Sequence, residues 1–552
     1  MSGINRRNFV SKSILGGLVV NSSPVQTLVE LMVGKASVAN AQTAPSEKKF
    51  VSIQQAGAPA RWMFDLLLNP YDDNNFIVNP QMGTVFKAEN NRYVETMYQL
   101  NTIKGLKLPP IWNFSLPKNG TSTQKMADAL LNHVIHIRGI DIGVPAHLFA
   151  QQLSFTPPGA VRSTTALAAE ISSAPFAAID IGTRGYIFKS IYPLVSTSLV
   201  GGGQLLTELM QPFMNPTTVN NDANLKAALN NLSMEVEKAQ HALDMEFVAG
   251  QPGFEGLLRS RNDLWKILRS RFPDPATEWN RLFDKYETLV KRAINSVYPG
   301  INDKVVGAPI ADRTSDRFKN SHCLESNLVN SAGLDNLNSL ITANSSVNGL
   351  ANIFAVAEYA LVNHLTSSIS GGHAGINNLN FTPFKFQNFD EHTTGSVISL
   401  LMNTLSHAAL GSCLMEFISV LKEKNMFKDT VIDVHSEFNR APRKDLVGSD
   451  HGYHGGSTMI LTGMQESGPM IIGDIMRDFA RGNANDQYKG SWGNSAPMDA
   501  LAGASLIPAN KAATIAALLG VPSPTKTAYS VVSNNGGILD FAPGFSKGKI
   551  VG

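Results

Sequence analysis

The chain has 552 residues, of which 43% are hydrophobic and 16% are charged, and its formal net charge at pH 7 is +2. This length and apolar content allow a large buried core and exclude wholesale disorder. The near-neutral charge, without clustered Lys and Arg, excludes an obvious nucleic-acid-binding protein, and two cysteines exclude a disulfide framework.

Residues 1–41 have the features of a twin-arginine export signal. Arg6 and Arg7 precede a short apolar run from Ile14 to Val20, and Ala39-Asn40-Ala41 supplies a small-x-small cleavage pattern. The alternative is an ordinary basic N-terminus. The apolar run is too short to cross a bilayer, and no internal stretch reaches the roughly eighteen uncharged apolar residues of a membrane span. We therefore expect a periplasmic or secreted protein without a membrane span.

The export signal also carries the positive charge of the chain. Residues 1–41 hold four basic side chains and one acidic side chain, a net charge of +3, so the chain from residue 42 onward is left with −1. An anionic ligand of the mature protein would therefore have to be held by charged groups at its site, because a net charge near zero attracts an anion only weakly at long range.

Downstream of the signal, the apolar pattern predicts an α/β protein, and we expect one domain over residues 42–552. Alternating and β-branched runs predict strands at Lys49–Gln54, His133–Ile137 and Phe176–Ile181. Helical periodicity from about Leu225 to Val297 predicts a helical insertion over about residues 205–300, and Ser339–Leu365 is also helical in pattern.

The region after Gly371 has the strongest pattern. A long helix is expected from about Gly395 to Glu423, between a strand that ends near His392 and a buried strand at Asp429–Val434. Ser457–Leu461 is a further strand candidate. Strand, long helix and strand in succession predict a βαβ unit, and ligands bind at the carboxyl ends of strands in such sheets.

The first polar segment near a predicted strand end is Asp390-x-His392. Residues i and i+2 of an extended segment point to the same side, so this carboxylate and imidazole can converge on one cation. The alternative is a surface Asp and His in a polar loop.

The second segment, His435 to Arg440, directly follows the strand at Asp429–Val434. Glu437 is placed as a metal ligand or a base, and Arg440 can pair with an anionic substrate group through two parallel hydrogen bonds. The alternative is a Glu–Arg ion pair that braces the loop.

The third segment, Gly448 to Gly456, holds Asp450, His451 and His454 among glycines that let the backbone fold closely around a bound group. Its alternative is a glycine-rich surface loop. A further loop near a strand end, with Arg138, Asp141 and His147, has two interpretations. It is either an ordinary loop or a lining of the same cleft.

In this order, the three segments resemble the C-terminal half of the DUF1501 family, which belongs to the alkaline phosphatase/sulfatase superfamily. In that family an Asp-x-His segment precedes a long helix, a strand ends in Ser-Glu-Phe-Gly-Arg, and a Gly-x-Asp-His-Gly loop follows. The matching residues here are Asp390 and His392, then Ser436, Glu437, Phe438 and Arg440, then Gly448, Asp450, His451 and Gly452. The twin-arginine start fits the same family.

The resemblance implies a three-layer α/β/α sandwich with a mostly parallel sheet and two metal ions at the carboxyl ends of its strands. Asp390, His392 and His451 would hold one ion, Glu437 would lie near the second, and Asp450 would ligate or orient. The implied cofactor is a divalent metal such as zinc, calcium or manganese.

For this fold the resemblance implies hydrolysis of a small anionic ester, a phosphate or a sulfate. We expect Arg440 and His454 to be the substrate-binding residues. The alternative is a non-catalytic periplasmic or envelope binding protein on the same fold. The family's N-terminal Gly-Gly-x-Asp-Gly motif is not visible here, and no Ser, Thr or Cys nucleophile can be identified, which favours that alternative. The substrate and the oligomeric state are left open.

Overall fold

The computed structural model describes residues 48–59, 64, 84–89, 92–98, 101–172, 174, 176–183, 187–192, 195, 197–199, 275–301, 305–306, 346–375, 380–381, 384–385, 389–390, 396–442, 449–476 and 493–551. The predicted export signal, residues 205–274 of the predicted insertion and His392 lie outside these residues.

The centre of the molecule is an eight-stranded sheet. Its strand order is β10 (Thr197–Leu199), β9 (Ala178–Ile181), β12 (Ser368–His373), β1 (Lys49–Gln55), β15 (Thr430–His435), β18 (Gly456–Thr462), β8 (Val134–Ile140) and β19 (Met470–Ile472). All neighbours pair in parallel except at β18, which is antiparallel to both β15 and β8. The protein is therefore a mixed α/β structure with a mostly parallel sheet, as the sequence predicts.

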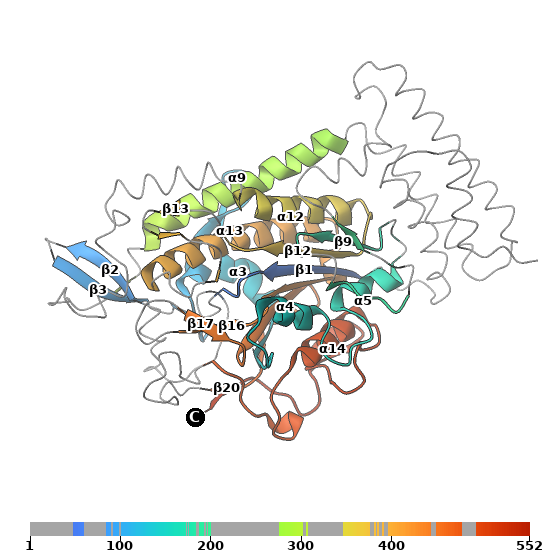
Figure 1. Cartoon of the computed structure of the whole chain (residues 1–552). Coiled ribbons are helices and arrows are strands. Elements are labelled where there is room, and N and C mark those ends of the chain that lie inside the picture. Colours follow the sequence, from blue (N-terminus) through green and yellow to red (C-terminus); the bar gives the residue numbers. More distant parts are fainter. Residues whose placement is uncertain are drawn as a thin grey trace, which may run out of the picture.

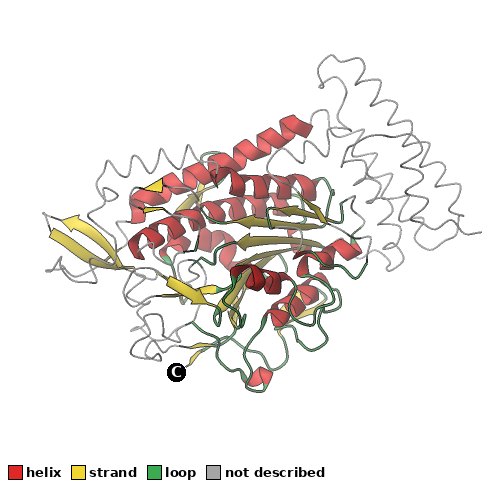
Figure 2. Ribbon diagram, in the orientation of Figure 1, coloured by secondary structure: helices red, strands yellow, loops and turns green. Residues whose placement is uncertain are grey.

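Helices cover both faces of this sheet, which lies between them in Figures 1 and 2. One face carries α3 (Met126–Leu130), α12 (Ser346–Val362) and α13 (Ser396–Glu423), with α9 (Pro275–Ile301) packed on the two longer helices. The other face carries α4 (His147–Phe155), α5 (Thr164–Ile171) and α14 (Pro508–Leu519).

Alternation along the strands produces two separate cores. Val51 and Ile53 of β1 pack into the cluster under α12 and α13, whereas Phe50 packs into the cluster under α5 and α14. In β15, Ile432 and Val431 divide between the two clusters in the same way. Successive side chains of a strand point to opposite faces, so apolar residues at every position bury both faces.

Smaller elements surround the main sheet. A three-stranded sheet contains β2 (Thr84–Glu89), β3 (Arg92–Tyr98) and β11 (Val305–Val306). Two-stranded pairs are β4 (Asn101–Ile103) with β5 (Leu106–Leu108), β6 (Ser115–Pro117) with β7 (Thr123–Lys125), β13 (Asn380–Phe381) with β14 (Phe384–Lys385), β16 (Asn439–Pro442) with β17 (Ser449–Gly452), β20 (Ile475–Met476) with β23 (Ile550–Val551), and β21 (Val532–Asn535) with β22 (Ile538–Phe541).

Most of the predicted elements are confirmed within a few residues. The predicted strand at His133–Ile137 begins one residue later, because His133 closes a short 3-10 turn. The long helix after residue 395 and the strands on either side of residues 436–455 are present.

The predicted βαβ unit differs in its first strand. Phe389 and Asp390 are not in a strand, and the main-sheet strand that precedes α13 is β12. β12 and β15 are parallel, but β1 lies between them in the sheet.

The described part of the predicted helical insertion belongs to the core. The Lys285 side chain of α9 is 9% exposed and forms ion pairs with Glu358 of α12 at 2.6 Å and with Glu416 of α13 at 3.3 Å. The phenol of Tyr286 donates to the same Glu358 carboxylate at 2.6 Å. These contacts fix α9 across the two longer helices.

One described helical segment, Asn403–Glu423, is long and apolar enough to cross a bilayer, and it is mostly buried inside the protein. The core helix of a soluble protein can have the same length and apolar composition. The absence of a membrane span stays a prediction from the sequence.

A buried ion pair joins α14 to the centre of the sheet. Lys511 Nζ lies 2.8 Å from Asp433 Oδ2, and both side chains are almost fully buried. Asp433 also accepts a hydrogen bond from Thr458, and His435 Nε2 lies 2.9 Å from Ser52 Oγ. Burial alone raises the pKa of Asp433, but the charges of Lys511 and His435 and the hydrogen bonds with Lys511 and Thr458 together outweigh burial and lower the pKa.

Removing one partner of this pair leaves a buried charge without compensation. We expect Lys511→Met to lower the free energy of unfolding by about 3 kcal/mol. Lys526→Met, at an exposed position, is the control and should change it by less than about 0.5 kcal/mol. Urea denaturation measures both, and equal effects of the two variants would contradict the assignment.

Candidate metal centre

The candidate site lies at the edge of the main sheet where the parallel strands end. Gly57 and Ala58 follow β1, Glu437 follows β15, and the loop after β8 leads to His147, the first residue of α4. Asp390 follows β12 in the chain. Because β18 is antiparallel, it starts at the same edge and brings the β16–β17 hairpin there. Ligands of open α/β sheets bind at this edge.

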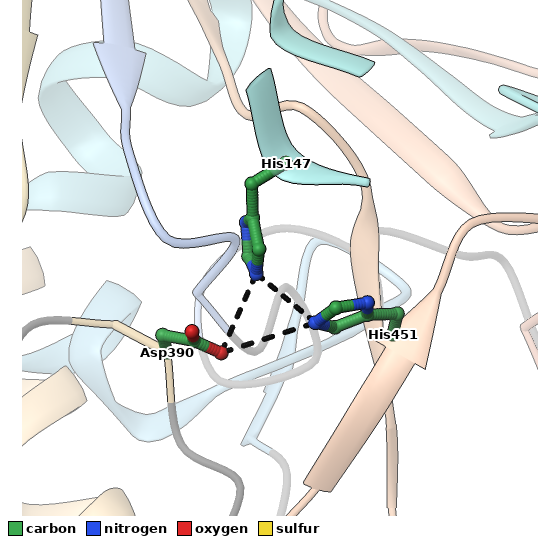
Figure 3. A group of neighbouring side chains, drawn as sticks. All are labelled: His147, Asp390 and His451. Carbon is green, nitrogen blue, oxygen red and sulfur yellow. Dashed lines mark hydrogen bonds and ion pairs between the residues drawn. The ribbon is translucent and has the colours of Figure 1, made fainter. Parts of the chain in front are cut away.

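Three side chains point toward one another here: His147, Asp390 and His451 (Figure 3). His147 Nε2 lies 3.0 Å from His451 Nε2 and 3.4 Å from Asp390 Oδ1. The remaining separation, between His451 Nε2 and Asp390 Oδ1, is 4.0 Å. The three side chains are between 20% and 34% exposed, so a small molecule can reach them.

These separations suit a metal ion. A point equally distant from the three ligand atoms lies about 2 Å from each of them, which matches zinc bonds to His nitrogen and carboxylate oxygen. Two imidazoles and one carboxylate form the ligand sets of several catalytic zinc and non-haem iron sites, where other coordination positions stay open. Within the described residues only these three groups converge in this way.

Glu437 supports His147 from the side that faces away from the other two ligands. Its Oε1 accepts hydrogen bonds from His147 Nδ1 at 2.8 Å and from the Gly57 amide at 2.7 Å. A carboxylate at Nδ1 orients the imidazole and leaves Nε2 for a metal. The structure thus places Glu437 behind His147, and the second ion, near which the sequence analysis expects Glu437, stays a prediction.

Arg440 braces the site from inside the protein. Its Nε donates to Ala58 O at 2.8 Å, and its Nη2 donates to Gly57 O at 2.6 Å and to Asp390 Oδ1. The side chain is fully buried. In the β16–β17 hairpin Arg440 lies directly opposite His451. The predicted contact of Arg440 with a substrate stays a prediction, since the guanidinium here bonds to the protein itself.

The charges of the centre interact strongly. Burial alone lowers the pKa of His147, but hydrogen bonds with Asp390 and Glu437 outweigh burial and raise the pKa to about 9. Burial alone raises the pKa of Asp390, but the bond with His147 and the charge of Arg440 hold it well below its usual range. The metal-free centre therefore holds an imidazolium between two carboxylates, and a metal ion must displace the Nε2 proton.

Two of the predicted ligands, Asp390 and His451, converge in the structure. His392 lies outside the described residues. Asp450 accepts the backbone N–H of His451 at 2.8 Å, which orients the loop without adding a ligand atom to the group.

His454 lies outside the converging group. It is exposed and its Nδ1 lies 3.0 Å from Asp141 Oδ1, so it does not join His451. His147 is the ligand that sequence reasoning left out of its metal set. The sequence signal for His147 is its place in the loop that follows the Val134–Ile140 strand. The sequence analysis allows that loop to line the same cleft, as one of two interpretations.

Comparison with known proteins yields no match to this chain among family models, curated proteins or solved structures. The resemblance to the DUF1501 family therefore stays a prediction.

A substitution at Gly57 tests how tightly the site is packed. Its φ is +100°, and a Cβ there would lie 3.1 Å from the Asp390 amide nitrogen and 3.2 Å from that of Phe389. We expect Gly57→Ala to displace Asp390 and to weaken zinc binding by about tenfold or more. The control is Gly105→Ala, at φ +76° with open space around it. Isothermal titration should show unchanged zinc affinity there, and a similar loss in both variants would contradict the packing argument.

The raised pKa of His147 predicts a pH dependence of the metal-free protein. Folding raises this pKa from 6.5 to about 9, so the stabilisation is fully present below about pH 6.5 and is lost as pH rises through about 9. We expect the urea midpoint to fall over that range, and His147→Gln to remove this part of the fall. An identical pH profile in the variant would contradict the assignment.

Proposed function

We propose that the chain is an exported, metal-dependent hydrolase of phosphate or sulfate esters, with one divalent ion held by His147, Asp390 and His451. The observation that carries the proposal is the convergence of three ligand atoms within 4.0 Å of one another at the carboxyl edge of the sheet. Zinc is the first candidate, because it takes this donor set, with manganese and calcium as the alternatives.

The proposal includes the three-layer, alkaline-phosphatase-like fold. Its support is the mostly parallel sheet with helices on both faces. The order of the three polar segments along the chain is consistent with that fold, and the N-terminal signal is consistent with export to the periplasm or beyond.

A bound divalent ion would lower the pKa of a coordinated water and polarise a phosphoryl or sulfuryl oxygen. The residues of the chain have supporting roles. His147 and His451 each offer Nε2, Asp390 offers Oδ1, and Glu437 keeps the His147 ring in its ligating orientation.

The charge of the centre favours an anion once the metal is bound. Asp390 and Glu437 contribute two negative charges, and Arg440 cancels one of them inside the protein. With neutral imidazoles, one divalent ion leaves a local charge of about +1, which suits a small anionic ester. Arg440 thus promotes anion binding through charge, while the metal supplies the direct contact.

Metal binding and turnover are measured on the full chain. We expect one zinc per chain in the wild type, and a loss of at least about hundredfold in affinity for His147→Ala and His451→Ala. His454→Ala is the matched control, because this exposed histidine lies outside the group. The His454→Ala variant should bind zinc as the wild type does, and it should have a higher KM for a substrate that His454 contacts.

A panel of phosphate and sulfate esters then separates the two functions. Zinc-dependent turnover that is lost in His451→Ala supports the hydrolase. Full zinc occupancy without turnover would favour the non-catalytic binding protein, and absence of metal binding would remove the proposed centre altogether.

A further inference from the structure

We propose that a buried aromatic stack positions the Asp390 carboxylate for metal binding, and that His407 of α13 is the positioning residue. The inference rests on the proposed metal centre and adds a residue that lies behind its ligands. It depends on how the structure holds Phe389, the residue directly before Asp390.

Phe389 is fully buried, although the next residue reaches the surface of the site. Its ring is stacked on the His407 imidazole, with centroids 5.9 Å apart and planes 12° apart. The His373 ring meets it edge-on at 5.7 Å. Both arrangements are favourable for aromatic rings.

The stack continues into the core. The His407 ring lies flat against Phe64, with centroids 4.4 Å apart and planes 7° apart, and Phe64 in turn stacks on Trp112 at 6.2 Å. The Trp112 indole N–H donates to the Phe64 carbonyl at 2.5 Å. His407, Phe64 and Trp112 are all fully buried, so the stack has a fixed inner end.

Two glycines close the space around Phe389. A Cβ on Gly375 would lie 3.0 Å from the Phe389 ring, and a Cβ on Gly57 would lie 3.1 Å from the Asp390 amide nitrogen. Neither neighbour can be larger without displacing this segment. The ring of Phe389 therefore has one position, which the His407 ring sets from the α13 side.

This position determines where the Asp390 carboxylate lies. Asp390 Oδ1 faces His147 Nε2, His451 Nε2 and the Arg440 guanidinium at once. A shift of the Phe389 backbone by a fraction of an ångström changes all three separations together. Residues behind metal ligands commonly change metal affinity by about tenfold to hundredfold when they are altered.

The test compares three variants of the full chain. His407→Leu removes the flat ring, and His407→Phe keeps it. Phe417→Leu is the matched control, because Phe417 is a fully buried aromatic residue of the same helix that packs on Phe354 instead of the Phe389 stack. Zinc affinity is measured by chelator competition, unfolding by urea, and ligand geometry by the absorption spectrum of the cobalt(II)-loaded protein.

We expect His407→Leu to weaken zinc binding by about tenfold or more and to alter the cobalt spectrum. His407→Phe should stay within about twofold of the wild type in affinity and keep the cobalt spectrum. Phe417→Leu should lower stability and leave zinc affinity and the cobalt spectrum unchanged.

Other results would contradict the positioning role of His407, the hydrolase or the metal centre. Unchanged zinc affinity in His407→Leu overturns the inference, as does an equal loss in His407→Phe or in Phe417→Leu. Zinc binding without ester turnover in the wild type overturns the hydrolase and leaves the inference standing. A wild type that binds no zinc overturns both the metal centre and the positioning role.

Discussion

The buried guanidinium of Arg440 is the contact on which the site depends. It links the loop after β1 to strand β16 across 383 positions of sequence, and it also binds Asp390. A buried cation is costly unless acceptors surround it. The carbonyls of Gly57 and Ala58 and the Asp390 carboxylate supply those acceptors, so the geometry of three loops is coupled to the pairing of one charge.

Glu437 has the complementary role on the other side of the site. It accepts hydrogen bonds from the Gly57 amide and from His147. The segment after β1 is therefore held from two sides: Arg440 binds its carbonyls, and Glu437 binds its N–H. Ala58 adopts a left-handed φ of +54° in this loop, an uncommon conformation for a residue with a side chain. The surrounding hydrogen bonds offset the cost of that conformation.

Local patterns in the sequence predict the elements well, because alternation and helical periodicity are local properties. They also place Asp390 and His451 near strand ends. They do not predict His147 as a ligand, since that depends on strand order: β8 meets β15 only through β18. Nor do they identify the partners of Arg440: an ion pair with Glu437 is the alternative to a substrate contact, whereas the guanidinium bonds to Asp390 and to the carbonyls of Gly57 and Ala58.

The antiparallel strand β18 of the main sheet joins contacts that are close in sequence to contacts that are distant in sequence. β15 and β18 are joined by residues 436–455, so their pairing and the Arg440–His451 register come from contacts relatively close in sequence, which generally form faster than distant ones. His147 is 304 positions from His451, and loop closure over that length is slow. The three proposed ligands therefore come together only when the N-terminal and C-terminal parts of the sheet have joined. Under the proposed export of the folded chain, loading of the proposed metal ion would then follow the completion of folding.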